Sequence, residues 1–264
     1  MSSLALITGA SAGIGLQLAH GLAERGFDIV GVGSGDRILD LPEQLPGVEV
    51  HPVQADLSTR EGAEAVWQAV QQLDPPLEVA ALNAGRSLGG SFLDTDLDDE
   101  LAMLGLNVTS QVVLAKHVAR HMAQRRAERI LITSSLSATT PTPYESIYGP
   151  TRAFMSSFAQ GLRQELREFG VSVTVLMPGA TATMRPSHQR RPASRTVSTA
   201  VTAQRPTTNT PLTSQNARVS LPPSGTHWVI CAATEATRLM STGYSKVEPA
   251  ANGAQASSAN PRPP

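Results

Sequence analysis

The stretch that decides the fold lies at positions 4–15 and reads Leu4-Ala5-Leu6-Ile7-Thr8-Gly9-Ala10-Ser11-Ala12-Gly13-Ile14-Gly15. Its opening run is short and apolar, as expected of a strand that is buried on both faces of a parallel sheet. After the glycines, residues 14–25 have the apolar spacing of an amphipathic helix. A strand, a glycine-rich turn and a helix therefore follow one another in the order that leaves a helix N-terminus open toward an anion.

The glycines of this turn have separate uses. Gly9 turns the chain sharply, Gly13 lets backbone N–H groups approach a pyrophosphate, and Gly15 lets the helix pack close to the strand. A purely structural turn is the alternative, but the position at the first strand-to-helix junction favours a dinucleotide site. The predicted pyrophosphate-binding residues are Gly9, Ser11, Ala12, Gly13, Ile14 and Gly15.

Beyond this turn, β-rich runs alternate with amphipathic stretches. The predicted strands span residues 4–7, 28–32, 48–53, 79–82, 129–133 and 171–176, and the predicted helices span residues 14–25, 59–73, 97–125 and 146–169. The alternation predicts an α/β fold, a Rossmann-type doubly wound parallel sheet of about six strands with helices on both faces. Because ligands of such sheets bind at the carboxyl ends of the strands, we expect the chemistry in the loops that follow them.

Composition narrows the class of protein. The 264 residues are 41% hydrophobic and 4% aromatic, and the net charge of -1 gives no global attraction to nucleic acid or to a membrane. The single cysteine, Cys231, excludes an intramolecular disulfide framework and a multi-thiolate zinc site. No apolar run approaches the roughly 20 residues of a membrane span. We therefore expect a soluble, cytoplasmic protein.

Residues 184–264 differ from the preceding 183. They hold ten of the 19 prolines, with nine basic and only two acidic residues. Such a segment buries little apolar surface, so we predict a mostly disordered tail after a catalytic domain of residues 1–183, with only residues 228–232 able to form a strand. Nucleic-acid binding through the tail would be salt-sensitive, but its basic residues are scattered, and we expect no such partner.

The end of the second predicted strand bears on the choice between NAD and NADP. An acidic residue there binds the ribose hydroxyls and repels a 2′-phosphate. The chain reads Val32-Gly33-Ser34-Gly35-Asp36-Arg37, with no carboxylate at the first two positions after Val32. Ser34 and Arg37 favour NADP, whereas Asp36 is close enough to favour NAD instead.

Several ordered motifs resemble the short-chain dehydrogenase/reductase family over about the first 183 residues. They are the glycine turn of residues 8–15, Asp56-Leu57, Asn83-Ala84-Gly85, Asn107, Ser134-Ser135, Tyr148 with Arg152 four positions later, and Pro178-Gly179. The resemblance implies an NAD(P)-dependent oxidoreductase that transfers a hydride between the cofactor and a small or medium carbonyl or alcohol. It also implies a homodimer through the long helices.

The resemblance extends the predicted cofactor site beyond the glycine turn. Asp56 and Leu57 would bracket the adenine, Asn83-Ala84-Gly85 would support the central strand and the cofactor, and residues 178–183 would contact the nicotinamide end. The further cofactor-binding residues are thus Ser34, Arg37, Asp56, Leu57, Asn83, Ala84, Gly85, Tyr148, Arg152, Pro178, Gly179, Thr181 and Thr183.

The predicted catalytic residues follow from the chemistry of carbonyl reduction. A phenol, whose ordinary pKa is about 10, can deliver a proton to the carbonyl oxygen when nearby positive charge lowers that pKa. Tyr148 is the candidate acid, and Ser135, at the end of the fifth predicted strand, can hold the substrate oxygen beside it. Asn107 resembles the residue that anchors a proton-carrying water in this family.

Two departures from the family pattern qualify this expectation. Where the family has lysine four positions after the tyrosine, this chain has Arg152, which keeps a positive charge beside Tyr148 but makes a proton relay doubtful. The family's substrate lid, later helices and seventh strand are not recognisable from Met184 onward. The alternative hypothesis is therefore a dinucleotide-binding sensor or inactive partner with weak or no catalysis.

His117 and His121 lie one helical turn apart, which is a spacing that metal sites use. No third ligand or general-base glutamate accompanies them, so we expect no metal.

Overall fold

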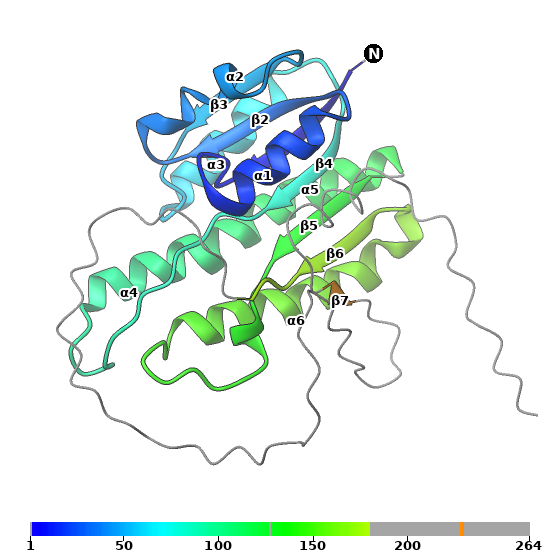
Figure 1. The fold of residues 1–264 in the computed structure, drawn as a ribbon. Helices are drawn as coiled ribbons and strands as arrows, with labels where there is room; N and C mark the ends of the chain where they lie inside the picture. Colours follow the sequence, from blue (N-terminus) through cyan, green and yellow to red (C-terminus); the bar gives the residue numbers. More distant parts are fainter. Residues whose placement is uncertain (1, 127, 180–227, 230–264) are drawn as a thin grey trace, which may run out of the picture.

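The sheet of the protein is parallel and has seven strands in the order β3-β2-β1-β4-β5-β6-β7 (Figure 1). The computed structural model describes residues 2–126, 128–179 and the backbone of 228–229. The strands are β1 (Ser3–Thr8), β2 (Phe27–Gly33), β3 (Val50–Gln54), β4 (Leu77–Leu82), β5 (Arg129–Thr133), β6 (Ser172–Leu176) and β7 (Trp228–Val229). The predicted fold class is therefore confirmed.

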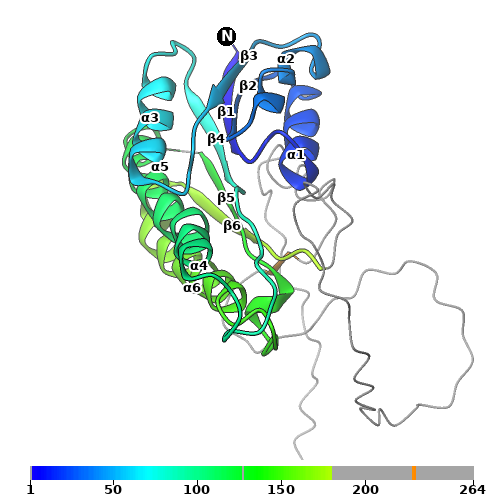
Figure 2. The ribbon, with the colours of Figure 1, turned by 90° about the vertical axis from the view of Figure 1, so that its left-hand side faces the viewer.

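Helices cover both faces of this sheet (Figure 2). The helices α1 (Gly13–Ala23) and α2 (Leu41–Gln44) lie on one face. The opposite face carries α3 (Arg60–Gln71), α4 (Leu97–Leu104), α5 (Ser110–Arg125) and α6 (Tyr148–Leu166). Alternate residues of a strand point to opposite faces, so Leu4 and Leu6 join the apolar core under α3, α5 and α6, while Ala5 and Ile7 join the core under α1. The near-continuous apolar run of β1 is the result.

The strand order reverses direction at β1, which has β2 on one side and β4 on the other. Thr8 pairs with Val32 at the end of β2, and Ile7 pairs with Ala81 near the end of β4. Because the strands are parallel, the loops after β1, β2, β4 and β5 leave the same edge of the sheet. Ligands of doubly wound sheets bind in the crevice at such a switch point.

The sequence prediction was wrong about one helix and missed another. The single helix predicted for residues 97–125 is interrupted by a π-helical turn, η2 (Gly105–Thr109), between α4 and α5. The short helix α2 after β2 was not predicted.

The prediction of a strand near residue 228 is confirmed for the two residues of β7, which pair with β6. The expected disorder of residues 184–264 otherwise lies outside the described residues. No helix among the described residues is long and apolar enough to cross a membrane.

Glu128, between α5 and β5, is a buried carboxylic acid far from the strand ends that form the predicted site. Its side chain is 4% exposed; Arg125 Nε donates to Oε1 at 3.1 Å, and Oε2 has no hydrogen-bond partner among the described residues. Burial raises the pKa of Glu128 to about 7, with the charge of Arg125 opposing and that of Glu78 adding to the shift. The folded protein therefore holds this proton more tightly than the unfolded chain, in which the pKa is near 4.5.

This shift predicts a loss of stability as the pH rises. Tighter proton binding by Glu128 stabilises the folded protein. This stabilisation is fully present below about pH 4.5 and is lost as the pH rises through about 7. We expect Glu128→Gln to remove a destabilisation on the order of 2 kcal/mol at pH 8 and to have much less effect at pH 5. Thermal unfolding of both proteins across this range tests the prediction, and pH profiles that run parallel would contradict it.

Candidate active site

The glycine turn after β1 has the geometry of a pyrophosphate cradle. Gly9 and Gly13 adopt φ angles of +72° and +57°, which residues with a side chain rarely adopt. A Cβ at Gly15 would lie 2.1 Å from Gly9 O, so α1 approaches the turn as closely as only glycine permits. Ala12, the N-cap of α1, provides no side-chain cap, and the first N–H groups of the helix therefore remain available to an anion.

A hydrogen-bond network behind this turn joins the ends of β1, β4 and β5. Thr8 Oγ1 accepts from the backbone N–H groups of Asn83 and Ala84, each at 2.9 Å. Asn83 Nδ2 donates to Thr8 O at 3.1 Å, and its Oδ1 accepts from Thr133 Oγ1 at 3.1 Å. Asn83 and Ala84 thus link the ends of β4 and β5 to the turn after β1. The sequence analysis missed Thr8 and Thr133, although both are hydroxyl residues at the ends of apolar strands.

The loops after β2 and β3 carry the residues that were predicted to bind the adenosine end of the cofactor. Ser34 and Arg37 are exposed after β2. Asp36 accepts a hydrogen bond from Gln54 Nε2 at 3.1 Å, so one of its carboxylate oxygens is already engaged by the last residue of β3. Gln54 was not identified from the sequence, because its contact with Asp36 depends on the pairing of β2 with β3.

The loop after β3 carries Asp56 and Leu57, the two predicted adenine contacts. Asp56 is exposed and accepts from Ser58 N at 2.8 Å, while Leu57 is buried.

Tyr148 and Ser135 belong to two elements that pack against each other. Ser135 follows β5 and caps the short helix η3 (Leu136–Ala138), where its Oγ accepts from Ser137 N at 3.2 Å. Tyr148 is the first residue of α6 and is half-buried. The η3 turn packs against the start of α6, since a Cβ at Gly149 would lie 3.3 Å from Ser137 O. Both hydroxyl side chains therefore belong to segments at the carboxyl edge of the sheet.

Arg152 lies one turn after Tyr148, and its guanidinium is directed at the site. Cζ of Arg152 lies 5.2 Å from the centroid of the Tyr148 ring. Nη1 donates to Thr133 O at 3.0 Å, and the side chain is only 5% exposed. Within the described residues no carboxylate forms an ion pair with this cation. The structure therefore places a permanent positive charge over the ring of Tyr148.

Asn107 is fully buried in the π-helical turn η2, and its side-chain amide is hydrogen-bonded to two other segments. Oδ1 accepts from Arg86 N and Nδ2 donates to Arg86 O, both at 2.9 Å. Nδ2 also donates to Thr151 Oγ1 at 3.1 Å, and Thr151 in turn donates to Tyr148 O at 2.7 Å. The amide thus joins the loop after β4 to the first turn of α6. Thr151 was not singled out from the sequence.

Comparisons with known proteins agree with this geometry. A sequence model of the family described as short chain dehydrogenase matches residues 3–193. The chain belongs to the short-chain dehydrogenase family. It is 31% identical over 188 residues to "Uncharacterized oxidoreductase YmfI" of Bacillus subtilis, a match that covers 69% of this chain and 76% of that protein. The chain is thus an oxidoreductase by family, as predicted.

Solved structures of the family share the fold. A short-chain dehydrogenase from Sphingobium yanoikuyae in complex with NADPH is 34% identical, with a TM-score of 0.65 and coverage of 69% of this chain and 72% of that chain. Acetoin dehydrogenase YohF from Salmonella typhimurium is 28% identical, with a TM-score of 0.66 and coverage of 72% and 77% of the two chains.

The segment after β6 reaches the same edge of this short-chain dehydrogenase. Pro178 O accepts from Leu136 N at 3.2 Å, which ties the segment to the turn that follows Ser135. Gly179 lies beside Leu136, because a Cβ at Gly179 would be 3.5 Å from Leu136 Cδ1. The predicted cofactor contacts Thr181 and Thr183 lie outside the described residues.

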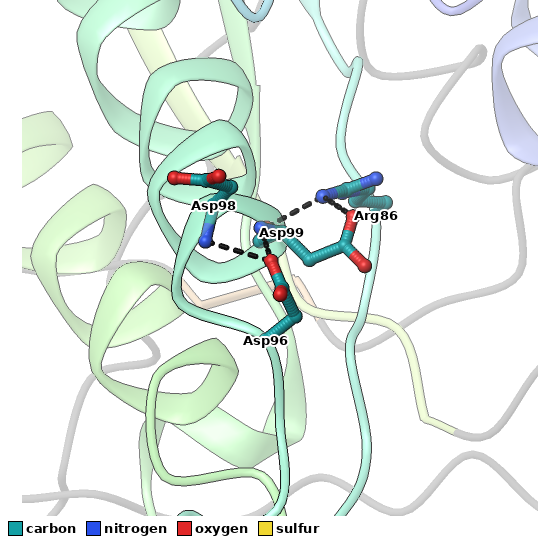
Figure 3. A network of polar contacts seen from close by, with 4 residues as sticks. All are labelled: Arg86, Asp96, Asp98 and Asp99. Carbon is teal, nitrogen blue, oxygen red and sulfur yellow. Dashed lines mark hydrogen bonds and ion pairs between the residues drawn. The ribbon is translucent and has the colours of Figure 1, made fainter.

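An ion pair joins the loop after β4 to the first turn of α4 (Figure 3). Arg86 Nη2 lies 3.1 Å from Asp99 Oδ1, and Asp96 caps α4 by accepting from the N–H groups of Asp98 and Asp99. Asp96 is thus the N-cap of α4, and the acidic residues of the first helical turn, Asp98, Asp99 and Glu100, complement the helix dipole.

The two histidines that have metal-site spacing contact a tryptophan in the α3–α5 interface. His117 Nε2 lies 2.8 Å from Glu64 Oε2 and its ring stacks on Trp67, while His121 meets Trp67 edge-on. No group of three metal-ligating side chains comes together within the residues that the structure describes.

Proposed function

We propose that this short-chain dehydrogenase interconverts a small or medium carbonyl compound and its alcohol with NADP(H), using Tyr148 as acid and base. The observation that carries the proposal is the Arg152 guanidinium, 5.2 Å from the Tyr148 ring centroid. This pair lies at the same sheet edge as the glycine cradle, whose short Gly9–Gly15 approach and uncapped helix N-terminus fit a pyrophosphate.

Each residue has one role in the proposed reaction. The bound dinucleotide supplies the hydride that is added to the carbonyl carbon. Tyr148 donates its hydroxyl proton to the carbonyl oxygen, while the Ser135 hydroxyl holds that oxygen in place. The charge of Arg152 stabilises the phenolate that remains on Tyr148. In the oxidative direction the phenolate accepts the alcohol proton.

Arg152 acts in this proposal through its charge and not as a proton relay. A guanidinium does not give up its proton at working pH. The buried side chain of Asn107 is bonded to Arg86 and Thr151, so in this proposal Asn107 helps to hold the first turn of α6, which carries Tyr148. A cofactor titration followed by a carbonyl and alcohol screen tests the activity. Tight NADPH binding with no turnover on a broad panel would favour a dinucleotide-binding sensor instead.

The preference for NADP over NAD rests on the end of β2. Gln54 binds the carboxylate of Asp36, whereas Ser34 and Arg37 are exposed beside it. With Asp36 engaged, a hydroxyl and a guanidinium are the groups available to a 2′-phosphate. The solved relative from Sphingobium yanoikuyae is a complex with NADPH, which supports the same assignment.

We expect Arg37→Ala to weaken NADPH binding by about tenfold, because it removes one charge-assisted contact with the phosphate. NADH binding should change by less than about twofold, since NADH has no 2′-phosphate. Fluorescence titration with both cofactors measures this, and Arg37→Lys serves as the charge-preserving control. Equal losses for NADPH and NADH would remove Arg37 from phosphate recognition.

We also propose a homodimer through the long helices. Leu97, Leu101 and Leu104 are exposed at helical spacing on α4, and Phe154, which stacks on Phe158, is exposed on α6. Such an apolar surface is typical of a protein interface. Sedimentation equilibrium of the full chain tests the proposal, and a monomer at all concentrations would contradict it.

A further inference from the structure

Gly85, in the loop after β4, faces the guanidinium of Arg152. A Cβ at position 85 would lie 2.1 Å from Nη2 and 2.9 Å from Cζ of Arg152, and 3.0 Å from Asn107 Oδ1. The backbone does not itself require glycine here, because Gly85 is not among the glycines with positive φ. The space that a side chain would fill is taken by the arginine.

The guanidinium is confined in this position. Nη1 is bonded to Thr133 O at 3.0 Å, and the side chain is 5% exposed. The helix turn below it is fixed as well, since Ser134 Oγ donates to Arg152 O at 2.8 Å and lies 2.7 Å from Ser156 Oγ. Nε of Arg152 is buried and has no hydrogen-bond partner among the described residues. Packing against position 85 and a single hydrogen bond to Thr133 therefore hold the charged group beside Tyr148.

We propose that Gly85 is a positioning residue for Arg152: the missing side chain at position 85 makes room for the arginine fork and keeps its charge at the Tyr148 ring. A lysine at position 152 would end in a single nitrogen and would have no counterpart to Cζ and Nη2. The requirement for glycine should therefore depend on which cation stands at position 152. The role of this pair in cofactor binding rests on the proposed function, whereas its packing does not.

The test places Gly85→Ala in two backgrounds, the wild type and Arg152→Lys. In the wild type the new methyl group displaces the guanidinium from Thr133 and Tyr148, and we expect NADPH binding to weaken by about tenfold or more and apo thermal stability to fall. In the Arg152→Lys background the same substitution should cost clearly less apo thermal stability, because only the 3.0 Å contact of the new methyl group with Asn107 Oδ1 then remains. Gly89→Ala is the matched control in the same loop, because its Cβ would meet only Tyr144 O, at 3.7 Å.

The outcomes separate this inference from the proposed function. Equal losses from Gly85→Ala in both backgrounds, or no loss in the wild type, would overturn the role of Gly85 as a positioning residue for Arg152. If the wild type binds neither NADP(H) nor NAD(H), the proposed function fails. Apo unfolding of the same four proteins then still decides whether positions 85 and 152 are coupled, since that measurement needs no cofactor.

Discussion

Replacing Tyr148 with phenylalanine is expected to lower kcat by roughly a hundredfold or more, because the proposed proton donor to the carbonyl oxygen is lost. NADPH affinity should stay within about twofold, since phenylalanine keeps the ring on which the Arg152 guanidinium lies, 5.2 Å from the centroid. A loss in kcat without a loss in binding would therefore report on the hydroxyl group alone.

Steady-state kinetics with the best substrate of the screen, together with NADPH titration, measure the two quantities separately. Tyr144→Phe is the matched control: Tyr144 lies four residues earlier, and its side chain is 69% exposed. We expect that variant to retain wild-type turnover. Unchanged turnover in Tyr148→Phe would remove Tyr148 from the mechanism.

The parts of the fold that the sequence predicted are those specified by neighbouring residues. The apolar run before Gly9 and the helical spacing after Gly13 are local patterns, and both elements appear where they were expected. The π-helical turn contains Asn107, whose side chain is bonded to Arg86, 21 residues away in the sequence. Periodicity contains no such long-range information, so one continuous helix was predicted.

The site was predicted in the same uneven way. Tyr148 and Arg152 share a helix, and their spacing was sufficient to predict that they lie together. Thr133, which accepts a hydrogen bond from the Arg152 guanidinium, lies on β5 and not on α6. Gln54 reaches Asp36 only because β3 pairs with β2. These residues become recognisable only when the order of the strands is known.

The second substitution with a large expected effect is Gly15→Ala, because α1 lies very close to the glycine turn. Gly15→Ala places a methyl group 2.1 Å from Gly9 O and 2.7 Å from Asn83 Nδ2. The backbone oxygen cannot move without changing the turn at Gly9, whose φ is already +72°. We expect a destabilisation of about 2 kcal/mol or more and at least a roughly hundredfold loss of NADPH affinity, because the N–H groups of the cradle are displaced.

Gly161→Ala gives the matched comparison for this prediction. Gly161 lies inside α6, and a Cβ there would meet nothing within 4 Å. The same chemical change should therefore stabilise the protein by up to about 1 kcal/mol, through helix propensity, and leave NADPH affinity unaltered. Urea unfolding and fluorescence titration of both variants separate the effect of a methyl group from the effect of its location. If the Gly15→Ala protein folded and bound NADPH as the wild type does, the binding of the pyrophosphate would not require the close approach of α1 to Gly9. The pyrophosphate would then be held elsewhere.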